Sequence, residues 1–309
     1  MNLAQQQQTA LQRMAGFVTA DEPLGPFTTY KLGGPALVFA TPRDSTELTM
    51  IAEFVQETGL PVLVVGRGSN LLVADTGFAG IAVSLAAVAE WIEFEGSTVA
   101  AGAAVALPVL ARRCVAAGLV GFEWAVGVPG SVGGAVRMNA GGHGSDMAAS
   151  LCGAHVLDLH TAVRAWMPVD ELNLQFRSSN LRDHQVVLDA RLQLALGDAA
   201  EAEANLSDVV RWRREHQPGG QNAGSVFVNP IPGELPAAVL IDQMGLRGFR
   251  VGGAFVSEKH ANFIQASDGA TAADVRAVME HVRAAVREST GFELRSEVRL
   301  VGFATAGAE

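Results

Sequence analysis

Two glycine-rich segments are the first places in this chain where residue type and spacing suggest chemistry. Residues 66–70 read G-R-G-S-N and residues 127–134 read G-V-P-G-S-V-G-G. Because glycine has no Cβ, the backbone N–H groups of such loops can approach a phosphate closely. Neither segment has the spacing of a P-loop or of a dinucleotide fingerprint, and Pro129 between two glycines favours a rigid turn. From this pattern, phosphate binding and tight turns in a β-rich domain both remain open.

Three polar side chains are further candidates. Arg177, in the segment F-R-S-S, can anchor a carboxylate or be a surface charge with a packed stem. Ser225 follows a glycine at a predicted loop-to-strand junction, where it can present its hydroxyl to a ligand or act as a turn residue. It lacks the G-x-S-x-G context of acyl transfer. Glu297 lies in the last predicted strand, where a solvent-facing position is the alternative.

The histidines and cysteines give no metal-ligand pattern. None of the seven histidines stands in an H-E-x-x-H or other paired spacing typical of zinc. His260 lies in the most polar cluster, S-E-K-H-A-N-F, where local hydrogen bonds are favoured over metal binding. Cys114 and Cys152 are too few for a disulfide framework, which indicates a reduced, cytosolic protein. We expect no metal.

The elements that must position these residues are mixed helices and strands. A helix capped by Asp44 and Ser45 is expected to end at Gly59, and others are expected over residues 107–116 and 272–287. Thr271 and Asp274 form a capping-box-like start for the latter. Strands are expected at residues 61–65, 71–73, 81–85, 92–94 and 292–301, and a strand pair at residues 30–40. The predicted architecture is α+β.

Composition excludes several classes of protein. The 309 residues are 49% hydrophobic and 17% charged, which favours a folded chain of about two domains over disorder. A net charge of −10, from 32 acidic and 22 basic residues, argues against nucleic acid as the main partner. No stretch has the length and apolarity of a membrane span, so we expect no membrane insertion. The glutamine-rich N-terminus does not resemble a secretory signal.

Eight ordered segments together resemble one known family, the flavin-dependent UDP-N-acetylenolpyruvoylglucosamine reductases of peptidoglycan synthesis, also called UDP-N-acetylmuramate dehydrogenases. They cover roughly residues 25–303 and include T-T-Y-K-L-G-G, V-G-R-G-S-N-L-L, the second glycine loop with M-N-A-G, and F-R-S-S. The remaining segments are A-G-S-V-F, L-I-D-Q, S-E-K-H-A-N-F and E-V-R. A lone glycine loop is weak support, whereas eight motifs in order are specific.

The resemblance implies a fold and a division of the chain. The fold is an FAD-binding domain of the vanillyl-alcohol-oxidase (PCMH) type, made of two α+β subdomains, followed by a C-terminal α+β substrate domain. Residues 1–24 are expected to be a leader, residues 25–198 the FAD-binding domain with a break near residues 80–90, and residues 199–309 the substrate domain. The acidic, alanine-rich stretch at residues 197–203 marks the expected boundary.

The resemblance also implies site residues. Non-covalent FAD would be held by the glycine loops and the M-N-A-G segment, namely Gly66, Arg67, Gly68, Ser69, Asn70, Leu71, Gly127, Val128, Pro129, Gly130, Ser131, Gly133, Gly134, Asn139, Ala140 and Gly141. Arg177, Ser225 and Glu297 match the family's catalytic arginine, serine and glutamate. The UDP-sugar would be contacted by Asn229, Gln243, His260 and Asn262.

The family's reaction has two halves: NADPH reduces FAD, and hydride then passes to the enolpyruvyl double bond of the UDP-sugar. Arg177 would hold the substrate carboxylate, Glu297 would hydrogen-bond to it, and Ser225 would deliver a proton to carbon. A cytoplasmic monomer is expected.

Four positions depart from the family pattern. Phe176 stands where a tyrosine is usual, His216 and Val228 where lysine is common, and Arg295 where a glutamate is common. Phe176, His216 and Val228 keep a non-catalytic flavin or UDP-sugar binding relative open as one alternative. Another FAD oxidoreductase of the same superfamily, such as an oxidase, is a second.

Overall fold

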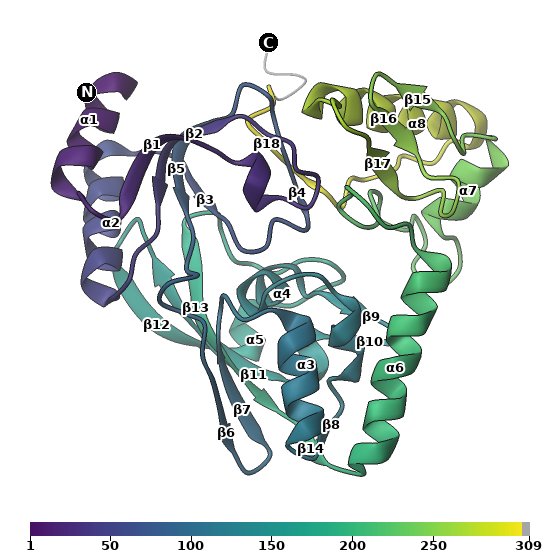
Figure 1. Ribbon diagram of the computed structural model, residues 1–309, viewed down its shortest axis with the longest axis horizontal. Coiled ribbons are helices and arrows are strands. Elements are labelled where there is room, and N and C mark those ends of the chain that lie inside the picture. Colours follow the sequence, from purple (N-terminus) through teal and green to yellow (C-terminus); the bar gives the residue numbers. More distant parts are fainter. Residues whose placement is uncertain (305–309) are drawn as a thin grey trace. The chain divides into compact units, whose positions relative to one another are not determined.

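Two groups of chain segments, called unit 1 and unit 2, make up the computed structural model, which describes residues 1–304 (Figure 1). Unit 1 comprises Met1–Glu22, Ala36–Arg67 and Ala79–Arg213, and unit 2 comprises Pro23–Pro35, Gly68–Phe78 and the chain from Arg214 onward. The chain therefore crosses between the units several times, and each has its own buried apolar core. The leader, FAD-binding and substrate divisions expected from the sequence stay a prediction.

Unit 1 contains two main sheets. One has the strand order β1-β2-β5-β3 and is formed by Val18–Pro23, Pro35–Ala40, Phe78–Val83 and Val62–Val64. The other has the order β12-β11-β13-β7-β6 and is formed by Val163–Pro168, Leu151–Asp158, Gln185–Gln193, Thr98–Gly102 and Ile92–Glu95. All neighbours in this second sheet are antiparallel, whereas β3 and β5 run parallel.

Unit 1 also contains several helices. They are α1 (Leu3–Arg13), α2 (Ser45–Thr58), α3 (Leu107–Ala116), α4 (Val132–Met138), α5 (Val169–Leu172) and most of α6 (Ala199–His216). The helix α4 contacts β13, and α5 contacts β11. Smaller pieces are η2 (Glu123–Gly127), η3 (Met147–Ala149), β8 (Leu119–Val120), β9 (Gly141–Gly142), β10 (Ser145–Asp146) and β14 (Ala195–Leu196).

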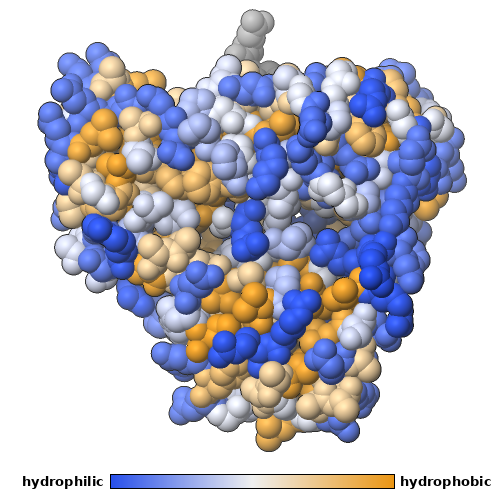
Figure 2. Space-filling view, viewed as in Figure 1, coloured by the Kyte–Doolittle hydropathy of each residue, from blue (hydrophilic) through white to orange (hydrophobic). Residues whose placement is uncertain are grey.

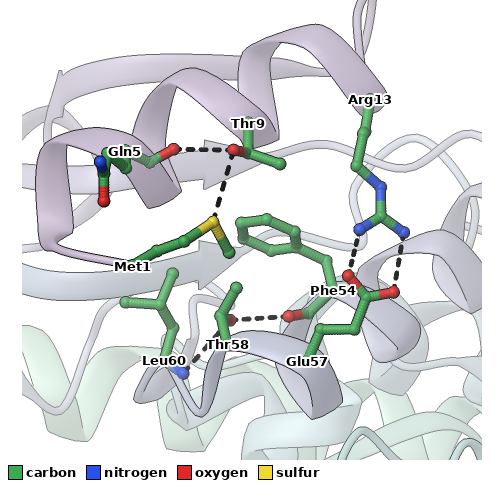
Figure 3. Close-up of polar contacts among 8 residues, drawn as sticks. All are labelled: Met1, Gln5, Thr9, Arg13, Phe54, Glu57, Thr58 and Leu60. Carbon is green, nitrogen blue, oxygen red and sulfur yellow. Dashed lines mark hydrogen bonds and ion pairs between the residues drawn. The ribbon is translucent and has the colours of Figure 1, made fainter.

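The N-terminal residues form a helix that packs on α2. Asn2 and Gln5 make a reciprocal capping box at the start of α1, and Ala10 and Met14 are buried in the core of unit 1. At the other end of α1, Arg13 pairs with the Glu57 carboxylate, with Nη2 and Oε1 3.1 Å apart (Figure 3). The leader expected from the sequence thus contains structured, partly buried chain.

Unit 2 is built on a small sheet and two helices. The strands β15 (Arg250–Val251), β16 (Ala254–Val256) and β17 (Ile264–Ala266) are antiparallel, and α8 (Ala272–Thr290) packs on them. The helix α7 (Ala237–Gln243) contacts α8. The strand β4 (Leu71–Val73) pairs in parallel with β18 (Arg299–Val301). A short 3-10 helix, η1, covers Gly25–Phe27. Burial raises the pKa of Tyr30, whose hydroxyl donates to the Ile264 carbonyl at 3.0 Å.

Most predicted elements are confirmed, and two are wrong. The helices over residues 107–116 and after Asp44 have the expected bounds, and the last helix extends to Thr290. The strand pair predicted over residues 30–40 is a single strand that begins at Pro35, because Gly33 and Gly34 pack against Val73 and Asp75 in a loop. The strand predicted over residues 292–301 is only Arg299–Val301, since of the residues before it only Ser296 pairs, in an isolated bridge to Phe227.

The surface along the C-terminal half of α6 is mainly hydrophilic (Figure 2). Arg211, Arg214 and Glu215 are exposed there. Within residues 1–304, no helix combines the length and apolarity that crossing a lipid bilayer requires.

Candidate active site

The first glycine loop presents a run of backbone amides without partners. In the described part of the chain, none of the backbone N–H groups of residues 66–70 donates a hydrogen bond to a protein acceptor. A Cβ on Gly66 would lie 2.6 Å from Ser131 Oγ, and one on Gly68 would lie 2.0 Å from the Phe27 carbonyl oxygen. Successive unpaired amides form a concavity that suits an anion. The loop therefore fits the phosphate-binding interpretation.

A buried hydroxyl lies beside this loop in unit 2. Thr29 donates its backbone N–H to the Gly68 carbonyl at 3.3 Å, and its Oγ1 is buried with no hydrogen-bond partner among the described residues. A buried hydroxyl without a partner costs free energy, which a bound polar group can offset. Thr29 lies in the T-T-Y-K-L-G-G motif, and the motif by itself indicates no function for this hydroxyl.

The second glycine loop is held against residues 103–107 of unit 1. Leu107 N–H donates to the Gly130 carbonyl at 3.0 Å, and Val132 N–H donates to the Val105 carbonyl at 2.9 Å. Between these bonds, the amides of Gly130 and Ser131 have no protein acceptor within residues 1–304. The helix α4 starts at Val132, with Ser131 as its N-cap, so the rigid turn predicted at Pro129 leads directly into a short helix. Both glycine loops fit an FAD pyrophosphate.

Helix α6 fixes the start of the second loop. The Arg213 guanidinium donates through Nη1 to the Gly127 carbonyl, and burial lowers the pKa of Arg213. A Cβ on Gly127 would lie 2.9 Å from Val209 Cγ1 and 3.4 Å from His143 Nε2. Any residue larger than glycine would therefore require these neighbours to move. Sequence reasoning missed Arg213, because no short motif connects residues that far apart.

Arg177 lies at a tight turn beside the predicted cofactor segment. Gln175 and Ser178 exchange backbone hydrogen bonds of 2.9 and 3.1 Å, and Arg177 between them has a positive φ of 57°. Its Nη2 donates to the Gly141 carbonyl at 2.9 Å, and its guanidinium carbon lies 4.8 Å from the centre of the Phe176 ring. Unit 1 therefore brings Arg177 together with the Asn139–Gly141 segment.

In unit 2, backbone hydrogen bonds bring Ser225 and Glu297 onto adjacent segments. Glu297 N–H donates to the Val226 carbonyl at 2.8 Å, and Asn70 Nδ2 donates to the Glu297 carbonyl at 3.0 Å. Ser225 is half-buried, and its Oγ makes no hydrogen bond within residues 1–304. A hydroxyl without a protein partner is available to a ligand.

The four predicted substrate residues have different environments in unit 2. Asn262 is buried, and its amide accepts from Phe227 N–H at 2.9 Å and donates to the Phe227 carbonyl at 2.8 Å, so it positions the chain next to Ser225. Asn229 accepts from Ala237 N–H at 3.1 Å at the start of α7. Gln243 is exposed. His260 is partly buried, and this burial, together with the positive charge of Arg247, lowers its pKa. Their contacts with a UDP-sugar stay a prediction.

Titratable groups give no sign of a metal centre. Among residues 1–304, no three His, Cys, Asp or Glu side chains gather in a group that could hold a metal ion. Burial raises the pKa of the Cys114 thiol to about 12, which makes it an inert core residue.

Family models match both parts of the chain. Residues 36–163 match an FAD binding domain, and residues 216–301 match the C-terminal domain of UDP-N-acetylenolpyruvoylglucosamine reductase. A reductase of that name from Heliobacterium modesticaldum is 44% identical over 91% of this chain and 90% of its own length. One from Bacillus subtilis is 38% identical over 94% of this chain and 96% of its length. The chain belongs to the UDP-N-acetylenolpyruvoylglucosamine reductase family.

Solved structures agree with this family assignment. The crystal structure of the reductase from Thermus caldophilus has a TM-score of 0.79, is 33% identical, and covers 92% of this chain and 98% of its own. Phl p 4.0202, a glucose dehydrogenase, shares the fold alone, with a TM-score of 0.50 and 12% identity over 68% of this chain and 50% of its own. The predicted vanillyl-alcohol-oxidase-type fold is confirmed, and this family member is an FAD-dependent oxidoreductase.

Proposed function

We propose that the protein catalyses the NADPH-dependent reduction of UDP-N-acetylglucosamine enolpyruvate to UDP-N-acetylmuramate, a step of peptidoglycan precursor synthesis. Relatives that align with more than nine-tenths of this chain carry the reductase name, which supports this activity. We further propose that the enzyme acts in the cytoplasm as a monomer. A mass near the 32.2 kDa of one chain, measured by light scattering during size-exclusion chromatography, is the expected result.

FAD, when bound, accepts hydride from NADPH and supplies it to one carbon of the substrate double bond. Reduction at that carbon leaves negative charge on the other carbon, delocalised into the adjacent carboxylate. We assign Arg177 to bind this carboxylate, because a guanidinium forms charge-assisted hydrogen bonds that strengthen as the charge develops. Its turn and its bond to the Gly141 carbonyl restrict the directions in which the guanidinium can point.

Ser225 is assigned as the donor of the proton that completes the reduction. The observation that carries this assignment is the half-buried Oγ of Ser225, which has no hydrogen-bond partner within residues 1–304, on a segment bonded to that of Glu297. A serine is a weak acid, but a carbanion-like enolate is basic enough to take its proton when the two are well placed. Glu297, if protonated, would donate a hydrogen bond to the same carboxylate.

Anaerobic NADPH oxidation by the FAD-loaded protein tests this proposal. Without sugar, NADPH consumption should stop at one equivalent per flavin, and it should become catalytic when the enolpyruvyl UDP-sugar is added. Turnover that needs oxygen instead of the sugar would point to an oxidase. Flavin that NADPH cannot reduce would support a binding protein without this catalytic activity.

A further inference from the structure

Asn139 is buried at the end of α4 with every hydrogen-bonding group of its side chain occupied. Its Nδ2 donates to Asp146 Oδ2 and to the Gln175 carbonyl, both at 3.1 Å, and its Oδ1 accepts from Ala148 N–H at 3.0 Å. The two acceptors and the one donor around it fix the orientation of the amide. The side chain is therefore committed to protein contacts, although the sequence places Asn139 among the cofactor residues.

The bond to Gln175 reaches the turn that carries Arg177. Arg177 has a φ of 57°, a left-handed conformation that glycine and asparagine adopt readily but arginine does not. A residue in such a conformation persists only when its surroundings hold it there. Asn139 holds the first residue of the turn, and the Gly141 carbonyl holds the Arg177 side chain.

Two opposite hydrogen bonds thus join the predicted flavin segment to this turn. Residue 139 donates to residue 175, and residue 177 donates to residue 141. The ring of Phe176 lies against the Arg177 guanidinium, where an aromatic face attracts a cation. The turn is therefore restrained at its base by Asn139 and at its tip by Gly141.

We propose that Asn139 is a positioning residue that holds the Arg177 turn in its strained, substrate-binding form through the Gln175 carbonyl. Asn139 also has a left-handed backbone, with a φ of 40°. Asparagine combines tolerance of that conformation with two N–H donors, whereas glycine has the tolerance without the donors. This inference rests on the proposed function only in giving Arg177 the substrate carboxylate as its ligand.

The test variant is Asn139→Gly, which keeps the backbone conformation and removes the side-chain bonds. Its matched control is Ala162→Gly, because Ala162 has a similar φ of 57° and an exposed side chain that makes no hydrogen bond. Trypsin cleavage after Arg177 in the FAD-loaded proteins reports how firmly the turn is held. We expect cleavage there to be about fivefold faster in Asn139→Gly and unchanged in the control.

Substrate kinetics provide the second measurement. In Asn139→Gly, the KM for the enolpyruvyl sugar should rise about tenfold, as expected when a charge-assisted contact is weakened. The rate of flavin reduction by NADPH and the Kd for FAD should change less than this KM does, because the polar groups of the side chain bond to protein atoms. An unchanged KM with unchanged cleavage, or an equal loss of FAD affinity and substrate affinity, would overturn the proposal.

A second variant covers the case in which Asn139→Gly does not fold. In Asn139→Asp with Asp146→Asn, the bond between these two side chains is restored with donor and acceptor exchanged, while Gln175 loses its donor. Faster cleavage after Arg177 is again expected, and cleavage at the parent rate would contradict the proposal. If the parent protein shows no sugar-dependent NADPH oxidation, the proposed function fails, whereas the cleavage comparison still decides whether Asn139 positions the turn.

Discussion

Gly59 and Gly68 have similar backbone conformations but different surroundings. Their φ values are 65° and 59°, yet a Cβ on Gly59 would have nothing within 4 Å, whereas one on Gly68 would lie 2.0 Å from the Phe27 carbonyl oxygen. We predict that Gly59→Ala costs about 1 kcal/mol through left-handed strain alone. Gly68→Ala should cost at least about 3 kcal/mol, because the backbone must also move.

Urea unfolding of the two variants measures this difference. Gly68→Ala should also retain less FAD after purification, because its loop carries the unpaired amides. Equal midpoints for the two variants would contradict the close approach of residues 27 and 68.

Ser225 can be tested separately from flavin reduction. In Ser225→Ala, we predict that NADPH reduces the flavin at nearly the parent rate, since the hydroxyl acts only on the sugar. Reoxidation by the enolpyruvyl sugar should slow about 100-fold or more, the usual effect of losing a proton donor. Stopped-flow absorbance of the flavin separates the two steps. Fast reoxidation in this variant would disprove the proton-donor assignment.

At the scale of elements, two carboxylates cap the start of α8, one from the helix itself and one from the loop after β4. Asp274 accepts from the backbone N–H groups of Thr271 and Gly253 at 3.0 and 3.1 Å, and Asp75 accepts from those of Ala272 and Ala273 at 2.9 and 3.0 Å. The bonds from Thr271 and then Gly253 hold the pKa of Asp274 below its ordinary value of 3.8. The sequence predicted the Thr271–Asp274 cap, but it could not predict Asp75, which lies 197 positions before Ala272.

The lowered pKa of Asp274 makes the stability of the protein depend on pH. A carboxyl group with a lowered folded-state pKa stabilises the fold above pH 3.8, and this contribution is lost as the pH falls through the lowered value. We predict that Asp274→Asn unfolds at lower urea concentration than the parent near pH 7. Below about pH 4 the difference should shrink, because protonation removes the parent's advantage. Urea midpoints measured from pH 7 to pH 3 test this, and a difference that grows on acidification would contradict it.

At the scale of the whole molecule, cofactor binding should stabilise the fold. A ligand present at 100 times its Kd adds about 2.7 kcal/mol to the free energy of unfolding. For a chain of this size, we predict that FAD raises the Tm of the apoprotein by roughly 5 °C. Riboflavin, which lacks the pyrophosphate, should raise it by about 1 °C or less, because it leaves the amides of the glycine loops unpaired. Equal shifts for both compounds would contradict the pyrophosphate cradle.

The sequence by itself determined the features that depend on neighbouring residues. The caps at Asp44, Gly59 and Thr271 follow from local hydrogen bonding, and the helix over residues 107–116 follows from its apolar period. Ordered motifs were enough to identify the family and, through it, the fold and the flavin. The caps and the apolar period involve residues only a few positions apart, and the family is identified from the order of its motifs. Both kinds of information are present in the sequence without knowledge of the fold.

Only the tertiary structure decided which distant residues support the site. Arg213 reaches Gly127, Asn139 reaches Gln175, and Asp75 caps α8, although each pair is separated by tens of residues or more. The strand predicted over residues 292–301 failed for a related reason, since only Arg299–Val301 meets a strand, β4, while Ser296 forms an isolated bridge to Phe227. Such contacts form only when the folded chain brings distant segments together. A local sequence pattern therefore does not indicate which distant group each polar side chain will bond.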